Sequence, residues 1–168
     1  MGHILVSIPV FLLLSVLQTV VVSRIEVLSG SGDIILLTII SWIIIDEEGS
    51  HIAWAIIGGF LISILSAMPI ASTMLTYFSI AMIAKFTSNV FWQSPILALF
   101  SASIAGTIIK FVIEFATMIF IDIPVPILIS ITNILLPTLL LNLFFTMPIY
   151  ILMGDLSRVV SPGEENYA

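Results

Sequence analysis

The sequence contains no cysteine and few charged residues, and each absence excludes a class of site. Without cysteine the chain has no disulfide, no thiolate metal site and no cysteine nucleophile. Only 8% of its residues are charged, and its four lysine and arginine residues are scattered singly along the chain. Because a nucleic-acid-binding protein needs clustered basic residues, this pattern and the net charge of -6 predict no nucleic-acid partner.

Hydrophobic residues take the place of the missing charges. They make up 60% of the chain, against about 45 to 50% in an ordinary globular protein. Apolar stretches of membrane-spanning length follow one another with only brief polar breaks. The sequence therefore predicts an all-α integral membrane protein, with a single polytopic domain over residues 1–155 and a short polar cytoplasmic tail over residues 156–168.

Breaks in the apolar pattern predict about six transmembrane helices. The apolar run over residues 52–84 would be roughly 50 Å long as one helix, which exceeds a hydrocarbon core of about 30 Å. We expect it to break at Met68 and Pro69 and to form a helical hairpin. The last segment contains Pro137 and Pro148 and is expected to be kinked or tilted. The predicted helices cover about residues 4–23, 31–45, 52–67, 70–84, 95–121 and 127–153.

Basic residues at the ends of these helices predict the orientation. With the N-terminus in the cytoplasm, Lys85 and Arg158 lie inside and Arg24 outside, which is the bias that the positive-inside rule favours. Six spans then place Asp122 outside and both termini in the cytoplasm. Trp42, near the end of the second segment, is expected at a membrane interface.

Lys110 and Glu114 lie inside the apolar run over residues 95–121 and are the first candidate site. They are four residues apart on one helix, so their charged groups can meet. Charged residues at this depth face protein or a water-filled cavity. Three roles remain open for the pair: mutual neutralisation that fixes the helix in the bundle, binding of a ligand or partner, and conduction of protons or ions.

Small residues form the second candidate feature. Ala98, Ala102 and Gly106 lie at four-residue spacing before Lys110, so they share one helix face with it. Gly58 and Gly59 form a smaller face in the third segment. Small residues let helix backbones approach closely in lipid, so both faces are predicted to pack against a partner or against another helix.

Other polar residues give weaker signals. Asn133 and Asn142 in the last segment are expected to hydrogen-bond between helices. The run Asp46-Glu47-Glu48 with His51 could suggest a metal, but neighbouring residues on a helix point in different directions. We predict no metal site, no cofactor and no catalytic residue, and hence a protein that is not an enzyme.

Three stretches resemble the rod-shape-determining protein MreD family. The stretch "LQTVVVSRIEVLSGSGDIILLTIISWIII" is similar to the family's first helix ending in Leu-Gln, followed by a short loop and an Asp before the second helix. The stretches "GGFLISILSAMPIASTML" and "NLFFTMPIYILMGDLSR" resemble the family's helical hairpin and its last helix, with Asn142 and Pro148. Where the family commonly has Asp, this chain has Ser63.

The resemblance implies a six-helix protein of the bacterial inner membrane, folded like the substrate-binding subunits of energy-coupling-factor vitamin transporters. It implies a scaffold without catalysis that works beside MreC, MreB, the glycosyltransferase RodA and a class B penicillin-binding transpeptidase. Membrane lipid surrounds such a protein. An alternative is the substrate-binding membrane subunit of a vitamin transporter, which would need a polar ligand pocket. A membrane enzyme acting on lipid-linked substrates would need an acid or histidine cluster.

Overall fold

A computed structural model describes residues 2–20, 22–24, 26–45, 51–124 and 126–160 of the chain. The described part is mostly helical, with one short antiparallel hairpin in which Glu26 pairs with Ser31 and Val27 with Gly30. The elements are α1 (Gly2–Val20), η1 (Val22–Arg24), β1 (Glu26–Val27), β2 (Gly30–Ser31), α2 (Ile34–Ile45), α3 (His51–Leu65), α4 (Ile70–Val90), α5 (Pro95–Phe120), α6 (Ile127–Ser130), the π-helix η2 (Ile131–Leu135) and α7 (Leu136–Val160).

The distribution of polar and apolar side chains is that of a membrane protein. Large apolar side chains such as Phe120, Leu140 and Phe144 are exposed, whereas Asp33, Thr107 and several other polar residues are buried. Within the described residues, three helices are long and apolar enough to cross a membrane, over Ile70–Val90, Pro95–Phe120 and Ile127–Val160. An apolar surface around a partly polar interior suits lipid as the surrounding solvent.

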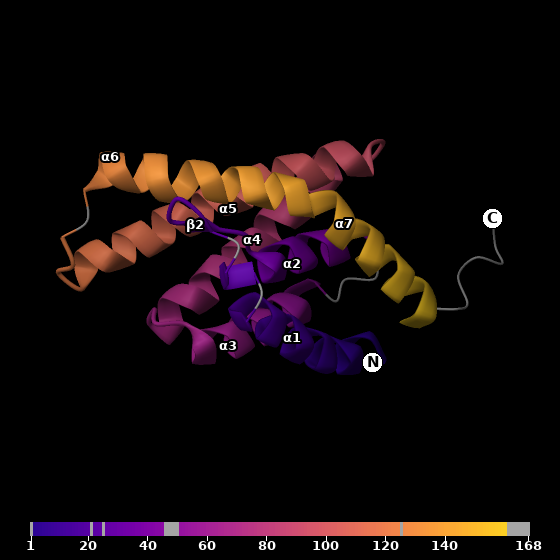
Figure 1. Cartoon of the computed structure of the whole chain (residues 1–168). Coiled ribbons are helices and arrows are strands. Elements are labelled where there is room, and N and C mark those ends of the chain that lie inside the picture. Colours follow the sequence, from indigo (N-terminus) through magenta and orange to yellow (C-terminus); the bar gives the residue numbers. More distant parts are fainter. Residues whose placement is uncertain (1, 21, 25, 46–50, 125, 161–168) are drawn as a thin grey trace.

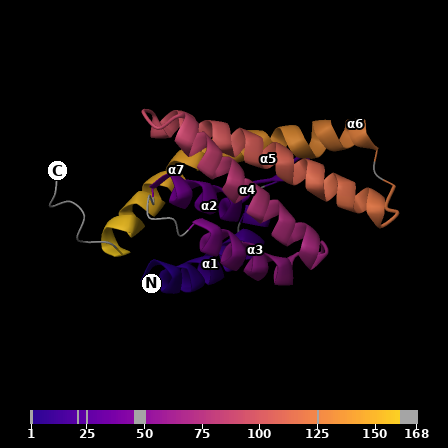
Figure 2. The same cartoon turned by 180° about the vertical axis from the view of Figure 1, so that it is seen from behind.

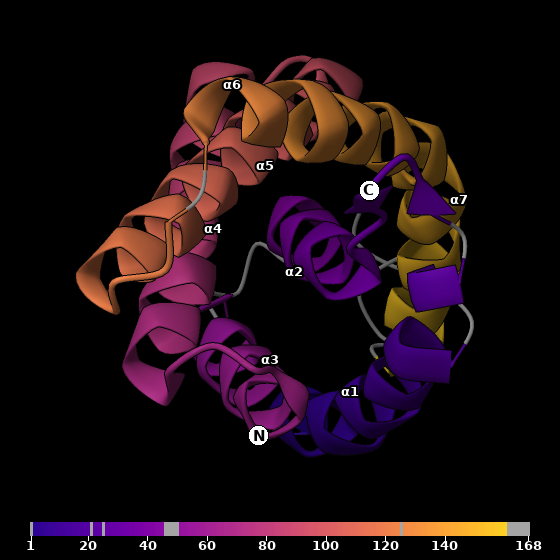
Figure 3. The same ribbon diagram turned by 60° about the vertical axis from the view of Figure 1, so that its left-hand side comes forward.

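Helix α2 lies at the centre of the bundle, and the other helices surround it (Figure 3). Its residues Ile34 to Ile43 are all buried, which fits a helix that is apolar on every side. At 12 residues it is roughly 18 Å long, too short to cross a hydrocarbon core of about 30 Å. The chain before α2 forms the hairpin and a loop that ends at Asp33, in which Val27 and Leu28 are exposed and Gly32 and Asp33 are buried.

Successive helical segments run back and forth between the two ends of the bundle (Figure 1). The beginning of α1, the α4–α5 connection and the end of α7 lie at one end, and the α3–α4 and α5–α6 connections lie at the other. The view from behind shows α3, α4 and α5 side by side (Figure 2). In this arrangement Lys85 and Arg158 belong to helix parts near the first end, and Arg24 and Asp122 lie toward the second.

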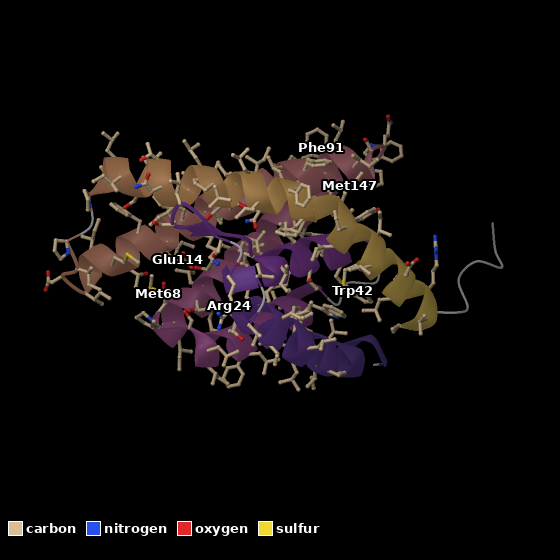
Figure 4. All side chains as sticks on the ribbon, viewed as in Figure 1. Arg24, Trp42, Met68, Phe91, Glu114 and Met147 are labelled. Atoms are coloured by element: carbon tan, nitrogen blue, oxygen red, sulfur yellow. The ribbon has the colours of Figure 1, made fainter. Side chains whose placement is uncertain are left out.

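A proline in α7 creates the place where the hairpin docks. Pro137 has no N–H, so the carbonyl group of Asn133, four residues earlier, is released from the helix ladder. The Ser29 N–H donates to that carbonyl oxygen at 3.0 Å. The adjacent Gly30 lies so close to the helix that a Cβ atom there would be 2.7 Å from the backbone nitrogen of Thr138. Pro137 is thus preceded by a π-helix, and the hairpin packs against the helix at this point. Helix α7 bends a second time near Met147, next to Pro148 (Figures 1 and 4).

Helix α5 has well-defined ends. It begins with Pro95 at its first position, where a missing N–H costs nothing. It ends in a Schellman motif, in which the Ile123 N–H donates to the Met118 carbonyl and the Asp122 N–H donates to the Ile119 carbonyl. Asp122 has a φ of 58°, in the left-handed region that this motif requires.

The predicted helix boundaries differ from the structure mainly in α4 and α7. Helix α4 continues to Val90 and does not stop at residue 84, because a single lysine does not break a helix and the next breaker is Pro95. The last helix continues through Val160, past its predicted end at residue 153, and the division between residues 155 and 156 stays a prediction. Arg158 donates to Asp155 at 3.2 Å one turn away, and this pair suits a helix. The helices predicted over residues 4–23, 31–45 and 52–67 correspond to Gly2–Val20, Ile34–Ile45 and His51–Leu65 in the structure. Residues 161–168 lie outside the described part.

Candidate polar site at the start of the central helix

Asp33 begins the central helix and is the hub of the site. Its Oδ1 atom accepts a hydrogen bond from the Leu36 N–H at 2.9 Å, the arrangement of a helix N-cap. The side chain is only 4% exposed. A carboxylate at a helix N-terminus also meets the positive end of the helix dipole. The local sequence thus explains why an aspartate stands immediately before an apolar run.

Lys110 of α5 and Tyr77 of α4 both contact the second oxygen of Asp33. The Lys110 ammonium group forms an ion pair with Asp33 Oδ2, and the Tyr77 hydroxyl donates to the same oxygen at 2.9 Å. The ammonium group also lies 5.9 Å from the centre of the Tyr77 ring, within the range of a cation–π contact. Lys110 is ten residues before the end of α5, so the ion pair lies roughly 15 Å inside that end.

Asn142 of α7 connects the start of α2 to α5. Its Oδ1 atom accepts from the Asp33 N–H at 2.7 Å, and its Nδ2 atom donates to Thr107 Oγ1 at 2.9 Å. Thr107 in turn donates to the Ser103 carbonyl at 2.7 Å. Asn142 is fully buried, so its amide has both a donor and an acceptor satisfied without water.

Gln18 of α1 completes the site. Its Nε2 atom donates to the Gly32 carbonyl at 2.8 Å, and its Oε1 atom accepts from the Ile34 N–H at 2.9 Å. The backbone on both sides of Asp33 is therefore held by one amide side chain. Four helices, α1, α4, α5 and α7, meet at the N-terminus of α2 through these polar groups.

Glu114 lies beside this network and takes a smaller part in it. Its Oε1 atom is 3.6 Å from the Lys110 nitrogen, beyond hydrogen-bond distance, and its side chain is 36% exposed. In the part of the chain that the structure describes, no group donates a hydrogen bond to the Glu114 carboxylate. Lys110 thus has Asp33 as its main partner, and the predicted Lys110–Glu114 neutralisation is secondary. Figure 4 labels Glu114 toward the end of the bundle that carries the α5–α6 connection.

A small cavity opens next to Lys110 and Glu114. Its volume is about 110 Å³, enough for a few water molecules and below the roughly 300 to 1,000 Å³ of typical ligand pockets. It lies between α5, the hairpin and the start of α7, and it is lined by Ser29, Ser31, Thr107, Lys110, Phe111, Glu114, Ile134, Leu135 and Thr138.

The chemistry available to Asp33 is limited by its partners. One oxygen accepts from the Leu36 N–H, and the other accepts from Lys110 and Tyr77. A carboxylate with both oxygens occupied is poorly placed to take a proton from a substrate. The geometry is that of a charge pair that joins helices and closes the start of α2.

The small residues pack inside the bundle against other helices, which is one of the two alternatives that the sequence left open. Ala98 and Ala102 are buried. A Cβ atom on Gly106 would lie 3.3 Å from Ile40 of α2, and one on Gly58 would lie 2.9 Å from the Phe11 ring of α1. Because α2 is central, the helices around it need small residues where they approach it. Gly59 similarly faces Tyr77 and Met74 of α4.

We expect Gly58→Leu to lower the free energy of unfolding by about 1 to 3 kcal/mol, because the new side chain overlaps the buried Phe11 ring. Reversible unfolding in mixed detergent micelles measures this change. The matched control is Gly154→Leu in α7, where a Cβ atom would meet nothing within 4 Å, and this variant should be at least as stable as the parent. A Gly58→Leu protein of unchanged stability would contradict the internal packing of this face.

The other polar and interfacial residues singled out in the sequence take no part in the network around Asp33. Among the described residues, the Asn133 side chain accepts one hydrogen bond, from the hydroxyl of its neighbour Thr132 at 3.4 Å, while its backbone carbonyl accepts from the Ser29 N–H of the hairpin. Trp42, predicted as an interfacial residue, is buried and stacks on Trp54 with ring centres 4.0 Å apart. Asp46-Glu47-Glu48 lies outside the described residues, and so does the His51 side chain. Within the described residues no group of three His, Cys, Asp or Glu side chains could hold a metal ion.

Sequence reasoning did not select Asp33, Tyr77, Thr107 or Gln18 as site residues. The signal for Asp33 was present, since an aspartate precedes an apolar run of 12 residues that is too short to cross a membrane alone. Tyr77 and Thr107 had no comparable signal, because isolated hydroxyl groups in apolar helices are common. Comparison of the chain with protein-family models, with curated proteins and with solved structures gives no match.

Proposed function

We propose that this chain is a non-enzymatic scaffold of the bacterial inner membrane that maintains rod shape by binding an MreC-like partner. It would act in the machinery that synthesises lateral peptidoglycan during elongation, beside RodA-like, transpeptidase and MreB-like components. The observation that carries the proposal is the meeting of Gln18, Asp33 and Asn142 at the start of α2. These residues belong to the first and last of the stretches that resemble the MreD family, in the Leu-Gln, Asp and Asn positions.

The site supports a scaffold in preference to the two other classes. The oxygens of Asp33 are occupied, and this argues against an acid–base enzyme at this position. The cavity beside Lys110 and Glu114 has about 110 Å³, which is small for a vitamin-sized ligand. The polar network instead joins four helices to the start of α2 and so holds the bundle in one shape. A scaffold needs a fixed shape because its partner binds to a defined surface.

In this proposal six segments cross the membrane, as in the substrate-binding subunits of energy-coupling-factor transporters, and both termini are cytoplasmic. Since the chain has no cysteine, single cysteines can report each connection. We expect a cysteine at position 122 to react with a membrane-impermeant thiol reagent from outside the cell, and a cysteine at position 158 to react only after the inner membrane is opened. The reverse labelling would contradict the orientation.

Depletion of the protein tests the proposed function. We expect depleted cells to lose rod shape and become wide or round, and the tagged protein to retain an MreC-like partner through purification in detergent. Complementation with Gly154→Leu, a change in open space, should restore both properties. Unchanged rod shape, together with tight binding of a vitamin-sized ligand by the purified protein, would contradict the scaffold and favour the transporter subunit.

A further inference from the structure

A second cavity lies at the opposite end of the bundle from the α5–α6 connection. Its volume is about 380 Å³, within the range of ligand pockets. It is formed by the end of α2, the last turns of α4 and the start of α5, next to the connection where Phe91 is labelled in Figure 4. The polar site around Asp33 uses none of its lining residues.

Polar groups of this cavity come from one face of α4. Lys85, Ser88 and Asn89 are spaced by three and four residues, so their side chains lie on the same side of the helix. Among the described residues, Lys85 has no carboxylate within 4 Å, and the side chains of Ser88 and Asn89 have no hydrogen-bond partner. Among the described residues, the lining of this cavity thus holds one ammonium group that has no carboxylate within 4 Å, with a hydroxyl and an amide beside it.

The remaining lining places the cavity at the edge of the membrane. Trp92, in the turn after α4, is 74% exposed, and exposed tryptophan is typical of the headgroup region. Ile43, Ile44 and Pro95 supply apolar walls below the polar groups. The positive end of the α5 dipole and the negative end of the α4 dipole both lie here and offset each other, so Lys85 supplies the net charge of the described lining.

We propose that this cavity binds the phosphate group of an anionic phospholipid, with Lys85 as its cationic contact. Ammonium groups bind phosphate as point charges, and hydroxyl and amide groups supply further donors. The apolar walls then contact the glycerol and the first part of the acyl chains. A basic pocket between membrane helices is a suitable place for an acidic headgroup.

Native mass spectrometry of the detergent-purified protein can test this site. We expect phosphatidylglycerol to bind about tenfold or more tightly than phosphatidylcholine, and Lys85→Gln to remove this preference. Lys85→Arg, which keeps the charge, should retain it. The matched control is Arg158→Gln, which removes a basic residue near the same end of the bundle but outside the cavity, and it should leave the preference unchanged.

Each outcome of this titration bears on the site. Displacement of bound phosphatidylglycerol by inorganic phosphate at similar concentration would show that the site recognises phosphate without the lipid tails. Equal preference in the parent protein and in Lys85→Gln, with both folded by circular dichroism, would overturn the proposal. Equal loss of preference in Lys85→Gln and Arg158→Gln would also overturn it, because the effect would then come from net charge. If Lys85→Gln is unstable, Asn89→Leu gives the second test, and unchanged lipid preference there would count against the site.

Discussion

Replacement of Asp33 by asparagine is expected to lower the free energy of unfolding by about 3 to 5 kcal/mol. The change keeps the size of the side chain and an oxygen that can cap α2, but it leaves the Lys110 ammonium group without its main partner. Glu114, 3.6 Å away and partly exposed, then compensates the Lys110 charge only weakly, roughly 15 Å inside the end of α5. Reversible unfolding in mixed micelles measures the loss.

Glu114→Gln is the matched control for this variant. It also removes one carboxylate charge near Lys110, but Glu114 is 3.6 Å away and partly exposed. The expected loss is therefore about 0 to 1 kcal/mol, as for other loosely paired and partly solvated charges. A larger loss in Glu114→Gln than in Asp33→Asn would mean that the pair within α5 is the important one.

Asn142→Leu should produce the second large effect, a loss of about 2 to 4 kcal/mol. Leucine has a similar size, but it leaves the buried Asp33 N–H without an acceptor and removes one bond to Thr107. Thr107 keeps its bond to the Ser103 carbonyl, so the cost stays below that of two fully stranded groups. The same unfolding measurement applies.

Asn133→Leu provides the comparison for Asn142→Leu within the same helical segment. Among the described residues, the Asn133 side chain has one hydrogen-bond partner, Thr132, and its backbone carbonyl still accepts from the Ser29 N–H after substitution. We expect a change within about 0.5 kcal/mol. Similar losses in the two asparagine variants would show that the position of Asn142 at the start of α2 has no special importance.

Membrane character and the important lysine could be predicted from composition and spacing. Lys110 stood out because it interrupts a long apolar run, and the small residues before it indicated a packing face. The partner of Lys110 was harder to predict, because Asp33 is 77 positions away and local spacing pointed to Glu114. Helical periodicity describes neighbours along one helix, whereas this contact depends on the central position of α2.

The docking of the hairpin on the π-helix could not be predicted from the sequence either. Pro137 predicted a kink, but the sequence did not indicate that the Asn133 carbonyl it releases would be taken by Ser29 from a segment about a hundred residues earlier. Small residues had a similar ambiguity, since Gly58 and Ala102 look the same whether they face a partner or their own bundle. Only the fold around α2 distinguishes the two roles.

A double-mutant cycle between Asp33 and Lys110 tests most directly the claim that these residues form the ion pair that closes the start of α2. The variants are Asp33→Asn, Lys110→Met and the combination, each unfolded in the same mixed micelles. We predict that the combined loss is smaller than the sum of the single losses by about 1 to 3 kcal/mol, since the second change removes the charge that the first one strands. Losses that add within about 0.5 kcal/mol would contradict the pairing of Asp33 with Lys110.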